Sequence, residues 1–251
     1  KMRYGYTLLE FIERYLPTGT VVSAAYDLDD GSSSVVAMAA ELSNIQEQGM
    51  GGRIGKLMTE GMQELAEEAT EELEEHEDEA LRPEADVTFC GSGNLAQVYF
   101  HAFPRRATMN ELNSAYPNLI PALLGHEGVG LVVVDDDEGV PLALGPRGAR
   151  NLHTGVVSGD DPLALYGDVE LRAWQVRRIS DYPCAGDLMI ISTVYPDNTV
   201  AALEELIGVH GGLGGEQTDS FLLHPADMVV SPTRSSTDVF GLLNARREAR
   251  A

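Results

Sequence analysis

The chain has 251 residues, 43% of them hydrophobic, which is enough for one large domain or for a core with a smaller attachment. It carries 40 acidic and 17 basic residues, so its net charge is −23, and we expect neither nucleic acid nor an anionic membrane as a general partner. Two cysteines exclude a disulfide framework, and the sequence contains neither a signal segment nor an apolar run of the ~20 residues that cross a bilayer.

The charged residues are unusual in kind as well as in number. Lys1 and Lys56 are the only lysines, and every other basic residue is arginine. Many carboxylates with almost no lysine are typical of a protein solvated in concentrated salt, where a screening length of about 3 Å removes the repulsion between them. A GC-rich genome explains the arginines but explains the acid excess less well. We therefore expect a halophilic, acidic protein.

The first third of the chain reads as helical. Expected helices span 6–16, 35–45 and 54–81, and a polar, glycine-bearing loop is expected over 18–34. The first helix has leucine and isoleucine at the spacing of one helix face and stops before Pro17. Residues 64–79 are mostly Glu and Asp, which is typical of a solvated helix face.

After Pro83 the pattern changes to short strands and turns. Strands are expected at 86–90, 95–100, 128–134, 140–144, 151–157, 188–192 and 221–223. Helices are expected at 108–124, with a capping box from Thr108 to Glu111 and a break caused by Pro117 and Pro121, and at 168–179. The fold class is thus mixed α/β, with a hairpin-rich subdomain over 91–157. The expected divisions are 1–85, 86–231 and a loose polar tail at 232–251.

The stretch 209–216, VHGGLGGE, is the most informative part of the chain. It places the imidazole of His210 beside a loop with almost no side chains, whose glycines permit positive φ and close approach of a ligand. Exposed loop amides bind anions, and a metal-bound imidazole beside them is suited to a phosphate. One histidine does not make a zinc site, which takes three or four ligands. The alternative is a glycine-rich turn that His210 merely caps.

Several sequence blocks resemble a known family. They are GSGNLAQVYF at 91–100, YPNLI at 116–120, LLGHEGVG at 123–130, GDDPLA at 159–164, HGGLGG at 210–215 and FLLHP at 221–225. Together they resemble the C-terminal half of prokaryotic alkaline-phosphatase-superfamily proteins of the phosphodiesterase/nucleotide-pyrophosphatase type. The resemblance runs from Arg3 to about Asp227, is weakest through the acidic run and is most specific in the glycine-rich block.

The resemblance implies an α/β/α sandwich, with a mixed sheet, in which two divalent metal ions, usually zinc, hold a phosphate ester. Carried over residue by residue, only His210 matches a metal ligand. Gly211 and Gly212 would form the phosphate loop, and Glu216 and His224 would orient the metal ligand, although a packing role is the alternative for His224. His126 is expected to end a helix as its C-cap.

The rest of the family's site has no counterpart in this chain. The nucleophile and the other metal ligands normally precede the Arg-Tyr-Gly segment, which here is Arg3-Tyr4-Gly5. The resemblance therefore implies a C-terminal portion of a phosphomonoesterase or phosphodiesterase, inactive alone and completed by an N-terminal half or a second chain. Some relatives carry a holin-like membrane segment before this part, so the resemblance allows membrane association through such a segment. The rival interpretation is a non-catalytic structural or interaction module.

Overall fold

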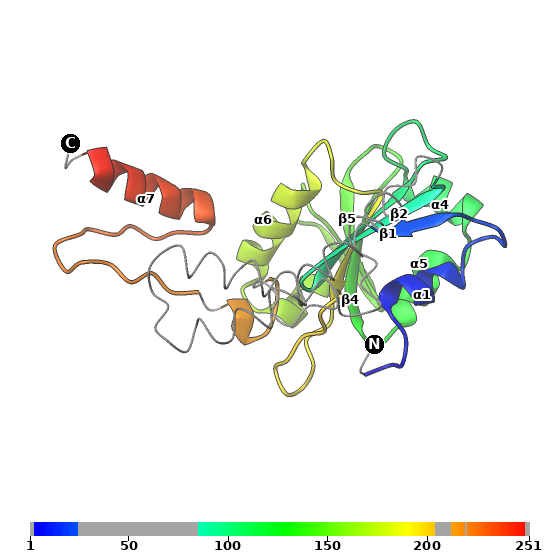
Figure 1. Cartoon of the computed structure of the whole chain (residues 1–251), viewed down its shortest axis with the longest axis horizontal. Coiled ribbons are helices and arrows are strands. Elements are labelled where there is room, and N and C mark those ends of the chain that lie inside the picture. The colour runs from blue at the N-terminus through cyan, green and yellow to red at the C-terminus, as the bar shows by residue number, and fades with distance from the viewer. Residues whose placement is uncertain (1–2, 25–84, 204–211, 219, 249–251) are drawn as a thin grey trace, which may run out of the picture. The chain divides into compact units, whose positions relative to one another are not determined.

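The computed structural model describes residues 3–24, 85–203, 212–218 and 220–248 (Figure 1). These belong to two compact units, Lys1–Thr218 and Asp219–Ala251. The helices expected over 35–45 and 54–81, and with them the acidic run, lie outside the described residues. None of the described helices has the length and apolar character needed to cross a membrane.

The first unit is built on one eight-stranded sheet in the order β1-β2-β3-β8-β4-β5-β6-β7. The strands are β1 (Val22–Ala24), β2 (Val87–Ser92), β3 (Leu95–Phe100), β4 (Val129–Asp135), β5 (Pro141–Gly145), β6 (Gly148–Asn151), β7 (Val157–Gly159) and β8 (Leu188–Ser192). Strand β1 runs parallel to β2, and every other neighbouring pair is antiparallel. The sheet is thus mixed, which confirms the mixed α/β class.

The central strands β4 and β8 are buried on both faces, which explains why their sequences are continuous apolar runs rather than alternating ones. Val132 and Val134 pack into one core, whereas Leu131 and Val133 pack into the other. The first core is covered by α1 (Leu8–Glu13), α4 (Met109–Ala115) and α5 (Leu119–Gly125). The second is covered by the 3₁₀ helix η1 (Pro162–Tyr166) and α6 (Val169–Ser180), so the unit has three layers (Figure 1).

Most elements predicted after Pro83 are present within a residue or two. The capping box is formed, with Thr108 N donating to Glu111 Oε2 at 2.9 Å and Glu111 N to Thr108 Oγ1 at 3.4 Å. The break expected in that helix separates α4 from α5, and Pro117 lies within it. The strand expected at 151–157 was wrong, because residues 152–156 form the turn between β6 and β7 and only Asn151 and Val157 belong to those strands. The hairpins expected to form a subdomain share the sheet with β1 and β8.

Three predictions in the outer parts of the chain were wrong. The loop expected over 18–34 contains β1, because Val22 pairs in register with Val87, a long-range contact that local composition does not encode. Residues 221–223 form no strand, and Phe221 and Leu223 are about nine-tenths exposed (92% and 90%). An amphipathic strand is stable only when a partner buries one of its faces.

The tail expected to be loose forms α7 (Ser236–Glu248) in the second unit. Asp238 accepts hydrogen bonds from the backbone N–H groups of Arg234 and Ser235 at 2.8 and 3.1 Å, which satisfies free donors where the helix begins. Arg246 and Arg247 lie in the last turn, where cations interact favourably with the helix dipole. The polar composition that predicted a loose tail therefore belongs to a solvated helix.

Candidate functional site

The β2–β3 turn, taken together with the last two residues of β2 as residues 91–94, lies beside the C-terminal end of β8. Asn94 is only 3% exposed, and its backbone carbonyl accepts a hydrogen bond from Ser192 N at 3.0 Å. Its side-chain Nδ2 donates to Leu213 O at 2.5 Å. Gly93 O accepts from Leu203 N at 2.6 Å. The turn therefore contacts the chain both before and after the stretch that contains His210.

The glycine loop, which we define as residues 212–218, needs glycine for reasons of space and of backbone conformation. A Cβ at Gly212 would overlap Asn94 Oδ1. Gly214 and Gly215 have φ of 93° and 65°, values that favour glycine. A Cβ on Gly214 would also lie 2.8 Å from the Tyr166 ring. The loop ends in the 3₁₀ helix η2 (Glu216–Thr218), where Thr218 Oγ1 donates to Gly215 O at 2.9 Å.

Tyr166 supports the glycine loop from the second core. Its hydroxyl donates to Ser192 O at 2.8 Å, and burial raises the pKa of this phenol, so it remains protonated. Gly130 lies where the β4–β8 register shifts, and a Cβ there would overlap the Tyr166 hydroxyl. The Tyr166 side chain therefore packs between Gly130 and Gly214, beside β8.

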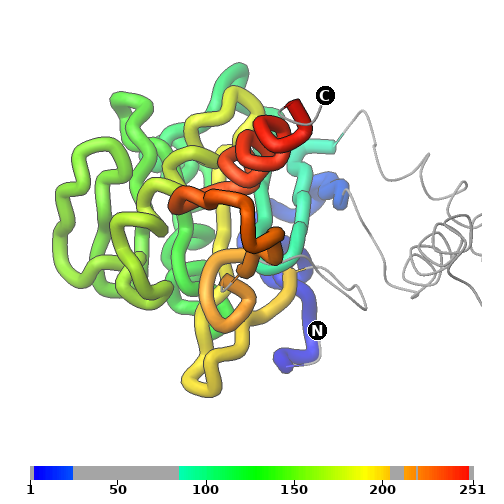
Figure 2. The backbone as a smooth tube through the Cα atoms, turned by 90° about the vertical axis from the view of Figure 1, so that its left-hand side faces the viewer, coloured from blue at the N-terminus to red at the C-terminus, as the bar shows by residue number. Residues whose placement is uncertain are grey.

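The N-terminal segment reaches the same end of the sheet (Figures 1 and 2). The Arg3 guanidinium lies 3.7 Å from the centroid of the Tyr195 ring, in the loop after β8, and Tyr4 Oη is 3.0 Å from Tyr195 Oη. The Tyr4 ring also contacts His126 edge-on, with centroids 4.8 Å apart. A backbone bond from Thr193 N to Gly128 O, at 3.0 Å, joins the chain after β8 to the chain before β4.

His126 occupies the predicted C-cap of α5, and its imidazole has a second function. Its Nδ1 accepts from Gly128 N at 2.9 Å, which leaves the proton on Nε2, 3.1 Å from Tyr6 Oη. Burial among aromatic rings lowers the pKa of His126, and Arg14 lowers it further while Glu127 opposes the shift. The imidazole is therefore held neutral.

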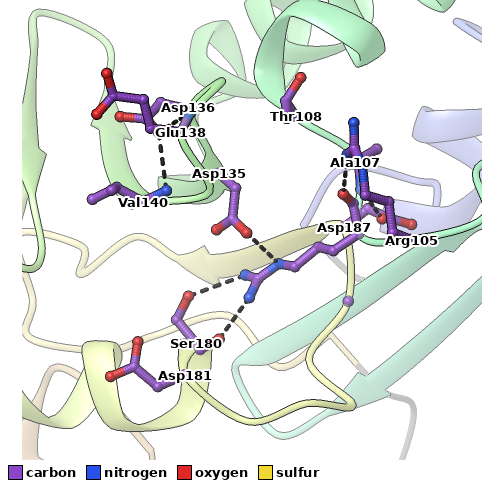
Figure 3. Close-up of polar contacts among 12 residues, drawn as sticks. Arg105, Ala107, Thr108, Asp135, Asp136, Glu138, Val140, Ser180, Asp181 and Asp187 are labelled. Atoms are coloured by element: carbon purple, nitrogen blue, oxygen red, sulfur yellow. Dashed lines mark hydrogen bonds and ion pairs between the residues drawn. The ribbon is translucent and has the colours of Figure 1, made fainter.

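A charged cluster closes the opposite end of β8 (Figure 3). Asp187, 6% exposed, accepts from Phe100 N and from Ala107 N, each at 2.6 Å. Arg106 donates to Ser180 O and Oγ at 2.6 and 3.0 Å, and its Nε lies 3.3 Å from Asp135 Oδ2. Burial raises the pKa of Asp135, and Arg106 partly offsets this effect. Asp187 bonds to backbone N–H groups, and Arg106 contacts Ser180 and Asp135, so the cluster joins β4, α6 and the segment before β8 rather than presenting a site.

The structure describes only some of the residues that the sequence singled out. His210 and Gly211 lie outside the described residues. Gly212 packs against Asn94, whereas Glu216 is exposed in η2. His224 belongs to the second unit, where its Nδ1 lies 3.0 Å from Pro225 O.

Sequence reasoning did not select Asn94 or Tyr166 as site residues. Asn94 lies in one of the blocks that carry the resemblance, and Tyr166 comes two residues after another, so membership of those blocks was the available signal. The sequence does not reveal the contacts that give these residues their roles, which are those of Asn94 with Leu213 and of Tyr166 with Ser192.

Two further observations limit the chemistry of the described parts. Among residues 3–24, 85–203, 212–218 and 220–248, no three His, Cys, Asp or Glu side chains gather in a way that could hold a metal ion. A shallow depression of about 620 Å³ lies beside α4, away from the glycine loop, and is lined by residues that include Arg105, Asn110 and Asp137.

Comparison of the chain with family models, with curated proteins and with solved structures found no match.

Proposed function

We propose that this chain is the C-terminal portion of a metal-dependent phosphomonoesterase or phosphodiesterase with an alkaline-phosphatase-like sandwich fold. The observation that supports this proposal is that several sequence blocks of the family resemblance lie together in the structure. The turn at 91–94, the segment 126–130, Arg3-Tyr4-Gly5 and the glycine loop all meet at the C-terminal end of β8. These segments are far apart in the sequence and belong to the blocks that carry the family resemblance.

In this proposal the chain contributes His210 as one metal ligand and the glycine loop as part of the substrate cleft. In the family that the chain resembles, the nucleophile and the remaining ligands precede the segment matched by Arg3-Tyr4-Gly5, so the proposal assigns them to a preceding segment or to a second chain. When bound, two zinc ions would stabilise the attacking and leaving oxygens of the phosphate ester. The described part of this chain would hold the glycine loop in place.

Because the net charge is −23, the metal ions would also offset the repulsion between the protein and a phosphate ester. A strongly negative protein repels a phosphate ester, and only a local positive charge reverses the sign at the site. Arginine residues are one source: Arg106 and Arg150 contact protein carboxylates, whereas the Arg3 guanidinium lies over the Tyr195 ring at this end of the sheet. In this proposal, bound divalent ions would be a second source of positive charge at the site.

The direct test is hydrolysis of p-nitrophenyl phosphate and bis-p-nitrophenyl phosphate, in molar KCl with zinc, by the chain joined to its preceding segment or partner. We expect zinc-dependent turnover that is lost in His210→Ala and retained in the control His101→Ala, whose exposed imidazole contacts Thr88. The 251-residue chain alone should have negligible activity. Equal turnover in both histidine variants would contradict the proposal, and absence of turnover in the complete protein would favour the non-catalytic module.

A further inference from the structure

The Arg3 guanidinium is held against an aromatic ring near the C-terminal end of β8. Arg3 is exposed, and its guanidinium lies over the Tyr195 ring, 3.7 Å from the centroid, while Tyr195 is only 9% exposed. A guanidinium over a ring keeps its N–H groups free, because they lie in its own plane, and that planar edge matches the oxygens of a phosphate group. Because the ring already restrains the side chain, less freedom is lost when an anion binds.

Arg3 differs from many of the other arginines in its partners. Ion pairs with carboxylates are formed by Arg105, Arg106, Arg147, Arg150, Arg177 and Arg246. Within the described part of the chain, no carboxylate forms an ion pair with Arg3. The nearby Asp197 is exposed and accepts from Thr199, whose hydrogen bonds lower the pKa of Asp197 more than the charge of Arg3 does. The Arg3 guanidinium is therefore available to an external anion.

A second donor belongs to the same ring. Tyr195 Oη and Tyr4 Oη are 3.0 Å apart, so two hydroxyl protons serve one shared hydrogen bond. Burial and the bond to Tyr4 raise the pKa of Tyr195, so its hydroxyl remains protonated. Among the residues that the structure describes, one of the two O–H groups therefore has no acceptor. Because Arg3 covers the ring that carries one of these hydroxyls, the guanidinium and the hydroxyl pair are close enough to donate to one phosphate group.

The loop after β8 connects these donors to the glycine loop. It contains Tyr195, and it also packs against the glycines. A Cβ on Gly214 would lie 2.5 Å from Val194 Cγ2, and a Cβ on Gly215 would lie 2.5 Å from Asn198 O. One segment of the chain thus places the donors and the glycine loop at the same end of the sheet.

We propose that Arg3, together with the hydroxyl pair of Tyr4 and Tyr195, binds a phosphoryl group at the C-terminal end of β8. The assignment of this group to the phosphate ester that the complete protein hydrolyses rests on the proposed function, whereas the anion site itself does not. Arg3 donates to two oxygens of the phosphoryl group in a bidentate arrangement, and the free tyrosine O–H donates to a third.

The first test titrates inorganic phosphate into the metal-free 251-residue chain and follows the Nε–H signals of isotope-labelled arginine by NMR, in molar KCl at constant ionic strength. Phosphate should shift the signal that is absent from Arg3→Ala and should leave the signal of Arg14 unchanged. Arg14 is the matched control, because its guanidinium also lies over a tyrosine ring, that of Tyr6, at 4.3 Å, but the Tyr6 hydroxyl already contacts His126 Nε2. No shift of the Arg3 signal, or equal shifts of both signals, would overturn the anion site. An equal shift of the Arg3 signal with acetate would overturn its preference for a phosphoryl group.

The affinity for phosphate, measured by calorimetric titration of the same chain, separates the two kinds of donor. It should fall at least about tenfold in Arg3→Ala and by a smaller factor in Tyr195→Phe, which keeps the ring beneath Arg3 but removes the hydroxyl. Arg14→Ala should bind phosphate as the wild type does. Arg3 and Arg14 are both exposed, so neither substitution opens a cavity in the core. Equal losses in Arg3→Ala and Arg14→Ala would show a general effect of charge and refute the site.

The second test uses the complete protein with zinc. Arg3→Ala should raise the KM for p-nitrophenyl phosphate about tenfold, because an interaction with the bound substrate is lost, whereas Arg14→Ala should leave the KM unchanged. An unchanged KM in Arg3→Ala would exclude the substrate as the anion bound by Arg3. If the complete protein shows no turnover, the proposed function fails, while the phosphate titration still decides the anion site.

Discussion

The two ends of strand β8 are closed by polar groups of opposite character. At its N-terminal end, Asp187, Arg106 and Asp135 are charged and contact protein groups. At its C-terminal end, Asn94 and Tyr166 are neutral, and the backbone beside them is rich in glycine. Buried charges are tolerated only when they are paired or hydrogen-bonded. Here Asp187 accepts from backbone N–H groups and Arg106 contacts Ser180 and Asp135, so the first end is committed to structure. At the other end, Asn94 and Tyr166 each donate to a backbone carbonyl, and the nearby charge of Arg3 lies over the Tyr195 ring.

Salt should affect the exposed carboxylates of the whole protein much more than the buried charges at the N-terminal end of β8, because buried charges are screened less. Forty carboxylates repel one another, and raising the salt from about 0.01 to 1 M shortens the screening length from about 30 to about 3 Å. Thermal melts should therefore show a large rise in midpoint from dilute buffer to molar KCl, the largest effect that we expect. A flat response would count against adaptation to salt and leave genomic bias to explain the arginines.

Asp187→Ala should be the most destabilising single substitution at the charged end. It leaves the buried N–H groups of Phe100 and Ala107 without their acceptor, and each unsatisfied group costs about 1–3 kcal/mol. We expect a loss of about 3–5 kcal/mol in the free energy of unfolding, measured by urea denaturation in molar KCl. Asp187→Asn keeps one acceptor oxygen and should lose less. Equal losses in the two variants would show that the hydrogen bonds are not the cause.

At the neutral end, Gly130→Ala should cost about 1–3 kcal/mol, the usual cost of overpacking, because the new Cβ overlaps the Tyr166 hydroxyl. In a Tyr166→Phe background the same substitution should cost clearly less, since the overlapping atom is gone. Urea denaturation of the four proteins gives the coupling. Additive losses would mean that the hydroxyl does not determine the requirement for glycine at 130.

The smallest expected effect concerns pH and His126, beside the neutral end. Its folded-state pKa is lowered, so the unfolded chain binds the proton more readily, and the stability contributed by the neutral imidazole is lost as pH falls below about 6.5. His126→Asn keeps an acceptor for Gly128 N but does not titrate. Between pH 7.5 and 5.5 its midpoint should fall by less than that of the wild type. Identical slopes would exclude His126 as the source.

The sequence by itself determined the elements whose signals are local. The apolar runs of β4 and β8, the β2–β3 turn and the box from Thr108 to Glu111 were all read correctly, because periodicity, turn residues and capping act within a few positions. Strand β1 and helix α7 were missed. Strand β1 depends on the pairing of Val22 with Val87, which is distant in the sequence. Helix α7 has a polar composition that is also typical of a loose tail.

The site divides in the same way. The sequence drew attention to the glycines at 212–215, since glycine-rich stretches are visible without a structure, and the family resemblance marked the blocks around them. Only the tertiary structure decided that Asn94 and Tyr166 hold that loop, and that Gly130 and Gly212 are fitted to those two side chains. These are contacts between residues up to 119 positions apart, such as Asn94 and Leu213. Sequence patterns encode the propensity of each segment, whereas the packing of the sheet sets which segments meet.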